Sequence, residues 1–364
     1  MYDVAIVGAG GAGTALLDAI APLPLRVVVV DPVRDKGNDR TWCFWSAAPT
    51  PVDGIAHRVW TRAQVGGHPL ELAPFRYLMV RSGDFYARAG ARADAEWITE
   101  SATVRDGREA AEVVAGDRRL TARWVFDSRP FLPARRVTLL WQHFAGAVVD
   151  TPYDAFDPDV ATLMDFAVPQ PPDGLAFRYS LPLTARRALV EYTVFGRERY
   201  PVDAELAACL PAGHRVVETE RGAIPMTDGR FPRRVGRRVF RIGTAGGATR
   251  GATGYTFAAM LRQAAAIADA LAHNRTPVPP PPYPRRHRLA DAALLRAVDR
   301  NLVDGPGFFT DFLTGQPIER ALRFLDGDTS VVEDLAVLAG TPIPAMLRAT
   351  AGYLSAAARR RVGW

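Results

Sequence analysis

The chain has 364 residues, 48% of them hydrophobic, and a formal net charge of +6, so two closely joined domains are expected rather than one compact core. It has no apolar run of about 18 residues, and its first strand begins directly at the N-terminus, which argues against a transmembrane helix and a signal peptide and predicts a cytoplasmic protein. The two cysteines and six scattered histidines predict no metal site. The excess of basic residues favours binding to a nucleotide phosphate or to an anionic membrane surface. Nucleic-acid binding is less favoured, because the sequence contains no recognised nucleic-acid-binding module.

The N-terminal stretch predicts a dinucleotide-binding unit. Residues 4–8 form an apolar run that fits a buried parallel strand, and a G-x-G-x-x-G follows with Gly8, Gly10 and Gly13. The first glycine allows a tight turn, the second lets the backbone approach a pyrophosphate, and the third lets helix and strand pack closely. A helical segment and a second apolar run end at Asp31, where a carboxylate would accept the ribose hydroxyls of an adenosine. This acid disfavours a 2′-phosphate, so FAD or NAD is favoured over NADP; a glycine-rich turn in an ordinary α/β protein would leave the acid unexplained.

The next stretch, residues 36–45, places charged side chains before aromatic ones. This order predicts a loop that returns over the cofactor, with Arg40 and Trp42 as candidate cofactor contacts; the alternative is that the aromatic residues are ordinary core anchors. Residues 96–126 alternate in short runs broken by glycine turns, which predicts a β-meander. Its last strand returns to the parallel sheet and leads into Asp127, a further cofactor-binding candidate.

Residues 134–225 differ in character and predict a mostly antiparallel, substrate-binding sheet, because apolar strands alternate with proline-rich turns. In the run 187–195, strand alternation places Glu191 mid-strand among largely apolar neighbours. Burial raises a carboxyl pKa, and a carboxyl that stays protonated near neutral pH can act as a general acid. The alternatives are a glutamate paired with a buried arginine and a glutamate that faces solvent on an edge strand.

Residues 238–273 return to the first domain with a strand, a second glycine-rich turn and a long helix. The turn fits a second phosphate or flavin contact, and its candidate cofactor-binding residues are Gly243, Gly246, Gly247, Thr253 and Gly254. After a proline-rich connector, residues 286–364 are predicted to be helical. They end in Arg359–Trp364, a basic tail with a terminal tryptophan that suits a membrane surface, with a solvated helix as the alternative.

Together these elements predict an α/β fold (α+β overall) in three parts. A βαβ unit, an excursion, a meander and a returning strand follow the order of two-dinucleotide-domain flavoproteins. Residues 1–133 and 226–276 are expected to form a Rossmann-type dinucleotide domain. Residues 134–225 are expected to form the substrate-binding sheet, and residues 277–364 a C-terminal helical region.

Several segments spread along the chain carry a resemblance to a known family. They are the N-terminal glycine motif, Asn38–Trp45, Gln142–Phe144, Phe156–Phe166, Ala188–Thr193, Gly222–Met226, Gly243–Gly247 and Ala252–Phe257. In these segments the sequence resembles the lycopene β-cyclase family, FAD-binding carotenoid cyclases of bacteria. The glycine motif is shared by many flavoproteins, whereas the block 156–166 and the Glu191 strand are far more specific. The chain departs from the family in having Ala252 where serine is expected and in being rather short, which leaves room for a relative that acts on another polyene.

The resemblance implies a Rossmann-type FAD-binding domain and an enzyme that needs reduced FAD, with NADPH or another reductant as the electron source. Family members close the acyclic ψ-ends of lycopene into β-rings, giving γ-carotene and β-carotene, without net redox change. Glu191 matches the family's acidic strand motif and is implied as the acid–base group, while Asp165 is a second candidate carboxylate or else a turn residue. Because lycopene resides in the bilayer, peripheral contact with the inner membrane is also implied.

Other flavoprotein classes share the architecture that the resemblance implies. Aromatic monooxygenases normally carry Gly-Asp-Ala in the second FAD motif, where this chain has Gly243-Thr244-Ala245, which weighs against that class. A prenyl reductase of the same superfamily would consume reductant stoichiometrically. A flavin-binding protein without enzymatic activity is the remaining alternative.

Overall fold

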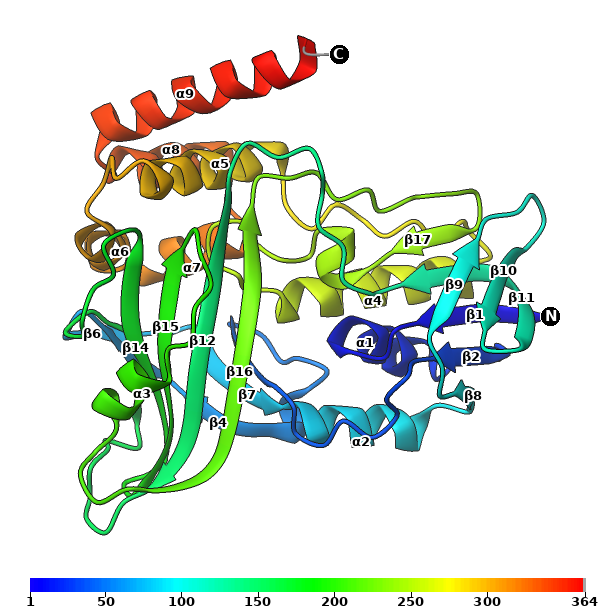
Figure 1. Cartoon of the computed structure of the whole chain (residues 1–364), viewed down its shortest axis with the longest axis horizontal. Helices are drawn as coiled ribbons and strands as arrows, with labels where there is room; N and C mark the ends of the chain where they lie inside the picture. Colours follow the sequence, from blue (N-terminus) through cyan, green and yellow to red (C-terminus); the bar gives the residue numbers. More distant parts are fainter. Residues whose placement is uncertain (363–364) are drawn as a thin grey trace.

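The computed structural model describes residues 1–362, with side chains to residue 359, and builds them from three β-sheets with helices packed around them (Figure 1). The strands are β1 (Tyr2–Val7), β2 (Val27–Val30), β3 (Thr41–Ser46), β4 (Ala56–Trp60), β5 (Arg62–Val65), β6 (His68–Glu71), β7 (Arg76–Arg81), β8 (Ala95–Ile98), β9 (Ala102–Arg105), β10 (Ala111–Ala115), β11 (Arg118–Asp127), β12 (Leu139–Asp150), β13 (Val160–Asp165), β14 (Leu175–Thr184), β15 (Arg187–Gly196), β16 (Arg215–Thr227) and β17 (Val239–Arg241). The α-helices are α1 (Gly11–Ile20), α2 (Ser82–Arg92), α3 (Asp203–Cys209), α4 (Phe257–Ala272), α5 (Arg285–Asp299), α6 (Gly305–Thr314), α7 (Ile318–Asp326), α8 (Val331–Ala339) and α9 (Ile343–Val362).

The first sheet is the dinucleotide sheet, in the order β8-β2-β1-β11-β10-β9 with β17 also paired to β11. Strands β8, β2, β1, β11 and β17 pair in parallel, whereas β9, β10 and β11 form an antiparallel meander. The valines of β2 are buried on both faces, because Val27 and Val29 pack with α1 and α4 while Val28 and Val30 pack with the meander. The predicted α/β fold class is confirmed; residues 96–98 of the predicted meander belong instead to β8.

The second sheet has the order β16-β12-β15-β14-β13-β5-β6, and we call it the substrate sheet after the role predicted for residues 134–225. Its pairings are antiparallel except that β13 and β5 run parallel, so the mostly antiparallel pattern expected from its apolar runs is present. β5 and β6 come from residues 62–71, and the chain therefore enters this sheet before it completes the first one. In Figure 1 the long green strands of this sheet stand beside the dinucleotide sheet. Residues from both sheets line one cavity.

A third, smaller sheet runs in the order β3-β7-β4. Residues 41–46 thus form a strand. The prediction of a loop over residues 36–45 is therefore wrong for residues 41–45. Phe44 and Trp45 are buried in different hydrophobic clusters on opposite faces of β3, because successive side chains of a strand point to opposite faces. They are core anchors, as the alternative interpretation expected.

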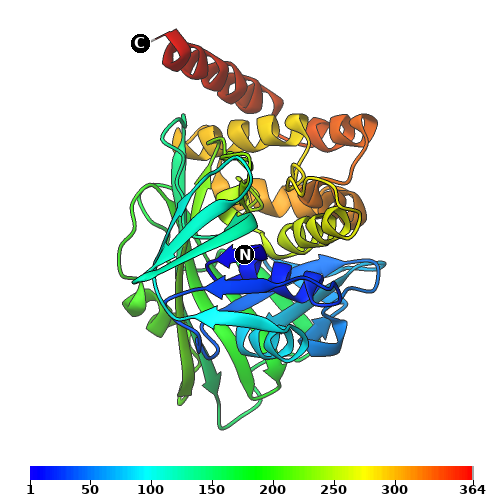
Figure 2. The same ribbon diagram turned by 90° about the vertical axis from the view of Figure 1, so that its right-hand side faces the viewer.

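The C-terminal part is helical, as predicted, with α5 to α9 stacked at one end of the molecule (Figures 1 and 2). α9 is the outermost helix in both views and packs against α5. Within residues 1–362, no helix combines the length and the apolar character that crossing a bilayer requires. The predicted basic tail ends at Trp364, which lies outside the described residues.

Candidate active site

A cavity of about 1080 Å³ lies between the dinucleotide sheet, the substrate sheet and the C-terminal helices. Its lining includes the first glycine turn at Gly10, the small sheet at Trp42 and the substrate sheet at Glu191. Leu338 of α8 and Met346 of α9 line it as well. Small-molecule pockets usually measure about 300–1,000 Å³, so this cavity has room for a cofactor together with part of a second ligand.

The first glycine turn leaves an open cradle at the start of α1. Gly8 has a φ of +91°, in the region that favours glycine, and a Cβ on Gly13 would lie only 2.0 Å from the carbonyl oxygen of Gly8. A Cβ on Gly10, by contrast, would meet no atom within 4 Å. Gly10 is the N-cap of α1 and supplies no side-chain cap, so the first N–H groups of the helix are free to bind an anion.

Asp31 lies directly after β2, lines the cavity and is only 8% exposed. The backbone N–H of Ala9 donates to its Oδ2 at 2.6 Å, which ties the acid to the glycine turn. Lys36 donates to Oδ1 at 2.6 Å, a contact that the sequence motif did not indicate. The carboxylate is therefore held at the adenosine end of the predicted cofactor site.

Trp42 and Arg40 both line the cavity, but their surroundings differ. Trp42 stacks on Phe257 with ring centroids 5.1 Å apart, and its Cζ2 would lie 2.8 Å from a Cβ on Gly11, so the indole packs against the start of α1. The Arg40 side chain is 61% exposed and its Nε lies 3.5 Å from a carboxylate oxygen of Asp39. The packed indole of Trp42 thus forms part of the cavity wall, whereas the charged side chain of Arg40 lies at the exposed edge of the cavity.

The second glycine-rich turn contributes unequally to the cavity. Gly243, Thr253 and Gly254 line it, while Gly246 and Gly247 shape the turn behind them. A Cβ on Gly246 would lie 2.4 Å from the carbonyl oxygen of Arg241, and Gly247 has a φ of +80°. Gly243 and Gly254 also have positive φ, +61° and +76°, so the backbone geometry favours glycine at all four glycine positions. Only Gly243, Thr253 and Gly254 lie on the cavity wall, where a ligand could reach them.

Asp127 ends β11 but does not line the cavity. Its carboxylate accepts a hydrogen bond from the guanidinium of Arg129 at 2.7 Å and another from the backbone N–H of that residue at 3.0 Å. The following residue, Ser128, does line the cavity and donates its hydroxyl to the carbonyl oxygen of Gly8 at 2.8 Å. The returning strand thus reaches the glycine turn as expected, through the residue after the predicted one.

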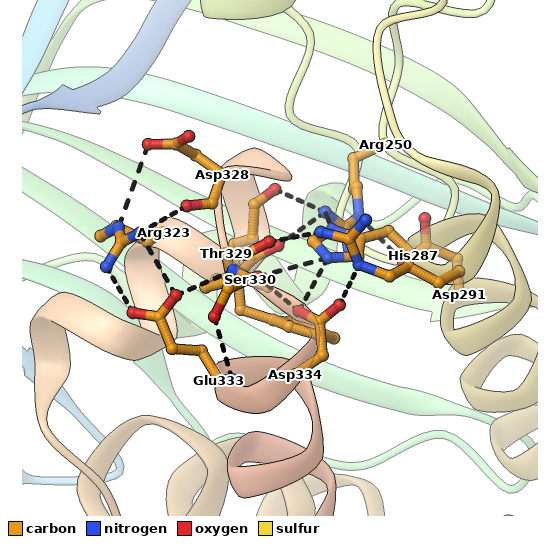
Figure 3. Close-up of polar contacts among 12 residues, drawn as sticks. Arg250, His287, Asp291, Arg323, Asp328, Thr329, Ser330, Glu333 and Asp334 are labelled. Atoms are coloured by element: carbon orange, nitrogen blue, oxygen red, sulfur yellow. Dashed lines mark hydrogen bonds and ion pairs between the residues drawn. The ribbon is translucent and has the colours of Figure 1, made fainter.

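Arg250 anchors the second glycine turn to the C-terminal helices (Figure 3). Its side chain is 1% exposed, and its Nε donates to Asp291 of α5 at 2.9 Å. Its Nη1 donates to the carbonyl oxygens of Phe324 and Leu325 of α7 at 2.8 and 2.9 Å. Sequence reasoning missed this residue, although a lone charge in a run of small residues was an available signal.

A second buried cluster continues from the Arg250 anchor toward α8. His287 of α5 contacts Asp334 of α8 at 2.9 Å, and Thr329 donates its hydroxyl to the same carboxylate (Figure 3). The three helices α5, α7 and α8 are therefore bound to one another and to the turn that lines the cavity.

Glu191 occupies the middle of β15, lines the cavity and is 8% exposed. Burial raises the pKa of its carboxyl well above the usual range, the neighbouring carboxyl of Glu220 raises it further, and a hydrogen bond from Thr193 opposes the shift. The causes that raise this pKa favour the neutral, protonated form of the carboxyl, which is the form that a general acid requires. No arginine or lysine among the described side chains forms an ion pair with it, so the alternative of a Glu–Arg pair does not apply.

Aromatic side chains from distant segments surround this acid. The hydroxyl of Tyr77 lies 2.8 Å from that of Tyr179 and 3.2 Å from that of Tyr255, and Trp45 packs edge-on against Tyr255 with centroids 4.4 Å apart. All four side chains line the cavity. Sequence reasoning did not identify them as a group, because they come from β3, β7, β14 and the segment before α4.

Asp165 lies at the end of β13, and the structure does not bring it together with Glu191. It pairs with Arg178 across the strands, at 2.5 Å between the carboxylate and the guanidinium. Arg178 is opposite Tyr192 while Tyr179 is opposite Glu191, so Asp165 points to the other face of the sheet. Its catalytic role stays a prediction that this placement does not support.

A family model described as "Lycopene cyclase protein" matches residues 3–351, nearly the whole chain, and confirms the resemblance found in the sequence. No curated protein matches the chain. The family match supports an enzyme.

Solved structures with similar folds include a reductase-like protein and two flavin-dependent enzymes. A geranylgeranyl bacteriochlorophyll reductase-like protein from Thermoplasma acidophilum aligns with a TM-score of 0.60 and 12% identity, over 95% of this chain and 98% of that one. The flavin-dependent brominase Bmp2 aligns with a TM-score of 0.57 and 17% identity, over 90% of this chain and 93% of that one. Aklavinone-11 hydroxylase, solved with FAD and aklavinone, aligns with a TM-score of 0.50 and 16% identity, over 74% of this chain and 62% of that one. At these identities the likeness shows the shared fold.

Proposed function

The chain belongs to the lycopene cyclase protein family, and from this premise we propose that it is a lycopene β-cyclase. It would close the acyclic ψ-ends of lycopene into β-rings, giving γ-carotene and then β-carotene, by acid–base chemistry without net redox change. In enzyme classification this is an intramolecular lyase, within the isomerases. The observation that carries the proposal is the carboxyl of Glu191, buried without a cationic partner among the described side chains in a large aromatic-lined cavity, where burial raises its pKa.

The first chemical step needs a proton donor that faces an alkene. Glu191 would transfer its proton to the terminal double bond, which forms a C–H bond and leaves a tertiary cation on the substrate. The next double bond closes the six-membered ring. The Glu191 carboxylate then removes a ring proton, so that the acid is restored and the β double bond is set.

The cation needs a neighbour of negative charge or high π-electron density. Trp45, Tyr77, Tyr179 and Tyr255 line the cavity beside the acid and offer ring faces and hydroxyl groups. Cation–π attraction contributes about 2 kcal/mol or more where water is excluded. These residues also keep water away from a cation that water would quench.

The cofactor that we propose is FAD, and the residues of the first domain fit it. The open space at Gly10 and the free N-terminus of α1 suit a pyrophosphate, and Asp31 is held at the adenosine end. Gly243, Thr253 and Gly254 line the path from there toward Glu191. When bound and reduced, with NADPH or another reductant as the electron source, FAD would supply negative charge beside the substrate cation. Arg40, Trp42 and Asp127 complete the proposed set, the last one through its contact with Arg129.

The substrate would be collected by peripheral contact of this cytoplasmic protein with the inner membrane. α8 and α9 line the cavity at Leu338 and Met346, and α8 exposes Val331, Val332 and Leu335 on its surface. Exposed apolar side chains that adjoin a cavity are typical of a surface that binds lipid or protein. No nucleic-acid partner is proposed.

The experiment that tests this function is pigment analysis of lycopene-accumulating cells that express the chain or its Glu191→Gln variant. We expect the wild type to convert lycopene to β-ring products of unchanged mass and the variant to lose at least about 100-fold in activity while keeping its flavin. Unchanged lycopene in cells whose purified protein holds FAD would contradict the proposal and favour another polyene. Oxygenated or reduced products would identify a monooxygenase or a prenyl reductase instead.

A further inference from the structure

Two carboxyl side chains meet over a glycine in the substrate sheet. Gly146 of β12 is directly opposite Glu191 of β15 on one side and directly opposite Glu220 of β16 on the other. Side chains at such positions share one face of the sheet. A Cβ on Gly146 would lie 2.8 Å from the Cγ of Glu191 and 3.2 Å from the Cγ of Glu220, so both glutamates lean into the space that the glycine leaves.

The two carboxyl groups lie close enough for Glu220 to raise the pKa of Glu191, and cations do not neutralise them. Glu220 accepts a hydrogen bond from the Thr41 hydroxyl at 2.9 Å. The nearby guanidinium of Arg81 is paired with Glu218, at 2.8 Å. Among the side chains of residues 1–359, no arginine or lysine forms an ion pair with either member of the pair. Ionising Glu191 would place a negative charge beside the Glu220 carboxyl, so this contact favours keeping a proton on Glu191.

The other ionisable groups that act on Glu191 come from different elements and are neutral. They are Cys43 of β3, Tyr179 of β14 and Tyr255 before α4, and burial raises the pKa of each of them. The hydroxyl of Tyr77 on β7 is hydrogen-bonded to the hydroxyls of both tyrosines. Tyr77 is also buried, and burial raises its pKa as well. Glu220 is only partly buried, so of the two acids it is the one that water can stabilise in its charged form.

We propose that Glu220 is a positioning residue for the catalytic acid: as the partly exposed member of a two-carboxyl pair, it keeps the shared proton on Glu191, where the cavity is. This role rests on the proposed cyclase function, in which Glu191 protonates the substrate. The proton balance is closed, because Glu191 gives one proton to a substrate carbon and takes one back from the ring. The pair therefore holds one proton before and after each turnover and consumes no further acid or reductant.

The test is the pH profile of kcat/KM for the wild type and the Glu220→Gln variant. Glutamine keeps the shape of the side chain and an oxygen for the Thr41 hydroxyl, but it carries no charge to hold the proton on Glu191. The alkaline limb is expected to move to lower pH by about one pH unit or more, with activity unchanged on the acid side, because a like charge beside a carboxyl raises its pKa and glutamine removes that charge. Glu218→Gln is the matched control, since this residue lies two positions away on the same strand and pairs with Arg81, and its profile should stay that of the wild type. An unmoved limb in Glu220→Gln, or a loss that is equal at every pH, would overturn the proposal.

A second measurement separates this proposal from the cyclase function itself. The infrared carbonyl band of the protonated Glu191 carboxyl, identified by its absence in Glu191→Gln, can be titrated in protein that need not turn over. In Glu220→Gln the band should disappear at lower pH than in the wild type. If the band shifts but the wild type does not cyclise lycopene, the role of Glu220 in holding the proton on Glu191 is supported and the proposed cyclase function is refuted. If the wild type cyclises lycopene and the band does not shift, the role of Glu220 is refuted.

Gly146→Ala provides an independent way to disturb the pair. The new methyl group would enter the space where the two side chains meet and force them apart without removing either carboxyl group. The Glu191 band is expected to shift in the same direction as in Glu220→Gln. An unchanged titration in a folded, flavin-containing Gly146→Ala protein would count against the contact.

Discussion

Burial determines the chemistry that Glu191 can perform. The carboxyl has 8% exposure and no cation partner among the described residues, so its ionised form loses hydration without compensation. Neutral hydroxyls rather than basic groups surround it on the cavity side. Burial of this kind favours the protonated form of the carboxyl, which is the form that the proposed proton transfer to an alkene requires.

The raised pKa of Glu191 predicts a pH-dependent stability. Because this pKa lies well above the usual 4.5, the folded state binds more protons than the unfolded state between the two pKa values. The stability that Glu191 contributes is therefore complete below about pH 4.5 and is lost as the pH rises through the folded pKa. We expect the unfolding temperature of Glu191→Gln, relative to the wild type, to increase as the pH rises from about 4.5 through the folded pKa of Glu191. A constant difference over this range would show that Glu191 is ionised in the folded protein.

The two glycines of the first turn make separable predictions. Gly10→Val should fold, because the added Cβ meets no atom within 4 Å. Its side chain would, however, fill the space proposed for the pyrophosphate, so the purified protein should lack flavin absorbance. Gly13→Val should instead lower the unfolding temperature, because its Cβ would lie 2.0 Å from a backbone oxygen. Gly90→Val is the control, an equally open glycine of α2 outside the cavity, and should keep its flavin. Normal flavin content in Gly10→Val would refute the pyrophosphate position.

At the scale of elements, the flexible second glycine turn is made rigid by its partners. Arg250 bonds within the turn through its backbone, since its N–H donates to the carbonyl oxygen of Tyr255 at 2.9 Å. Its side chain bonds to α5 and α7. The cavity wall at Gly254 and Tyr255 is therefore positioned by helices that follow it in the sequence by 30 to 70 residues.

Removing this anchor should destabilise the protein strongly. Arg250→Met leaves the carboxyl of Asp291 buried without its partner, which costs about 3–5 kcal/mol and should lower the unfolding temperature by about 10 °C. Arg262→Met is the matched control, because Arg262 is 48% exposed and lies 3.5 Å from Asp326 at the surface. Its loss should cost at most about 1 kcal/mol. Equal unfolding temperatures for the two variants would show that Arg250 does not hold the turn.

At the scale of the whole molecule, the cavity and the exposed apolar surface belong to the same end. α8 lines the cavity at Leu338 and presents Val332 and Leu335, 76% and 63% exposed, on its outer side. α9 exposes Ile343 and Leu347 and carries Arg348 beside them. This combination suits an anionic bilayer from which a hydrocarbon enters the cavity.

A double variant, Val332→Asp with Leu335→Asp, tests that surface. Each buried apolar side chain contributes about 1.5–3 kcal/mol, so sedimentation with phosphatidylglycerol vesicles should fall by about tenfold or more. Val216→Asp with Val217→Asp is the control, since these exposed valines lie on β16. Activity on detergent-solubilised lycopene should survive in both proteins. Unchanged vesicle binding of the α8 variant would place the membrane contact elsewhere.

The sequence by itself determined the features that depend on local pattern. The glycine motif, the adjoining valine strand and Asp31 lie within one short segment, so spacing was enough to predict the βαβ unit. The two-residue period of a strand was enough to separate the faces of β15, and the buried clusters confirm that Ala188 and Val190 lie on one face and Leu189 on the other. The cofactor-binding roles of the glycines stay predictions.

Only the tertiary structure decided which distant segments meet. Strand alternation says which way Glu191 points, but not that Gly146 and Glu220 lie beside it, because pairing partners and register depend on the whole sheet. The same holds for the tyrosines around the acid and for the helices that hold Arg250, which come from separate parts of the chain. Local pattern singled out Glu191 as the candidate acid, whereas long-range packing buries it and supplies the neighbour that raises its pKa.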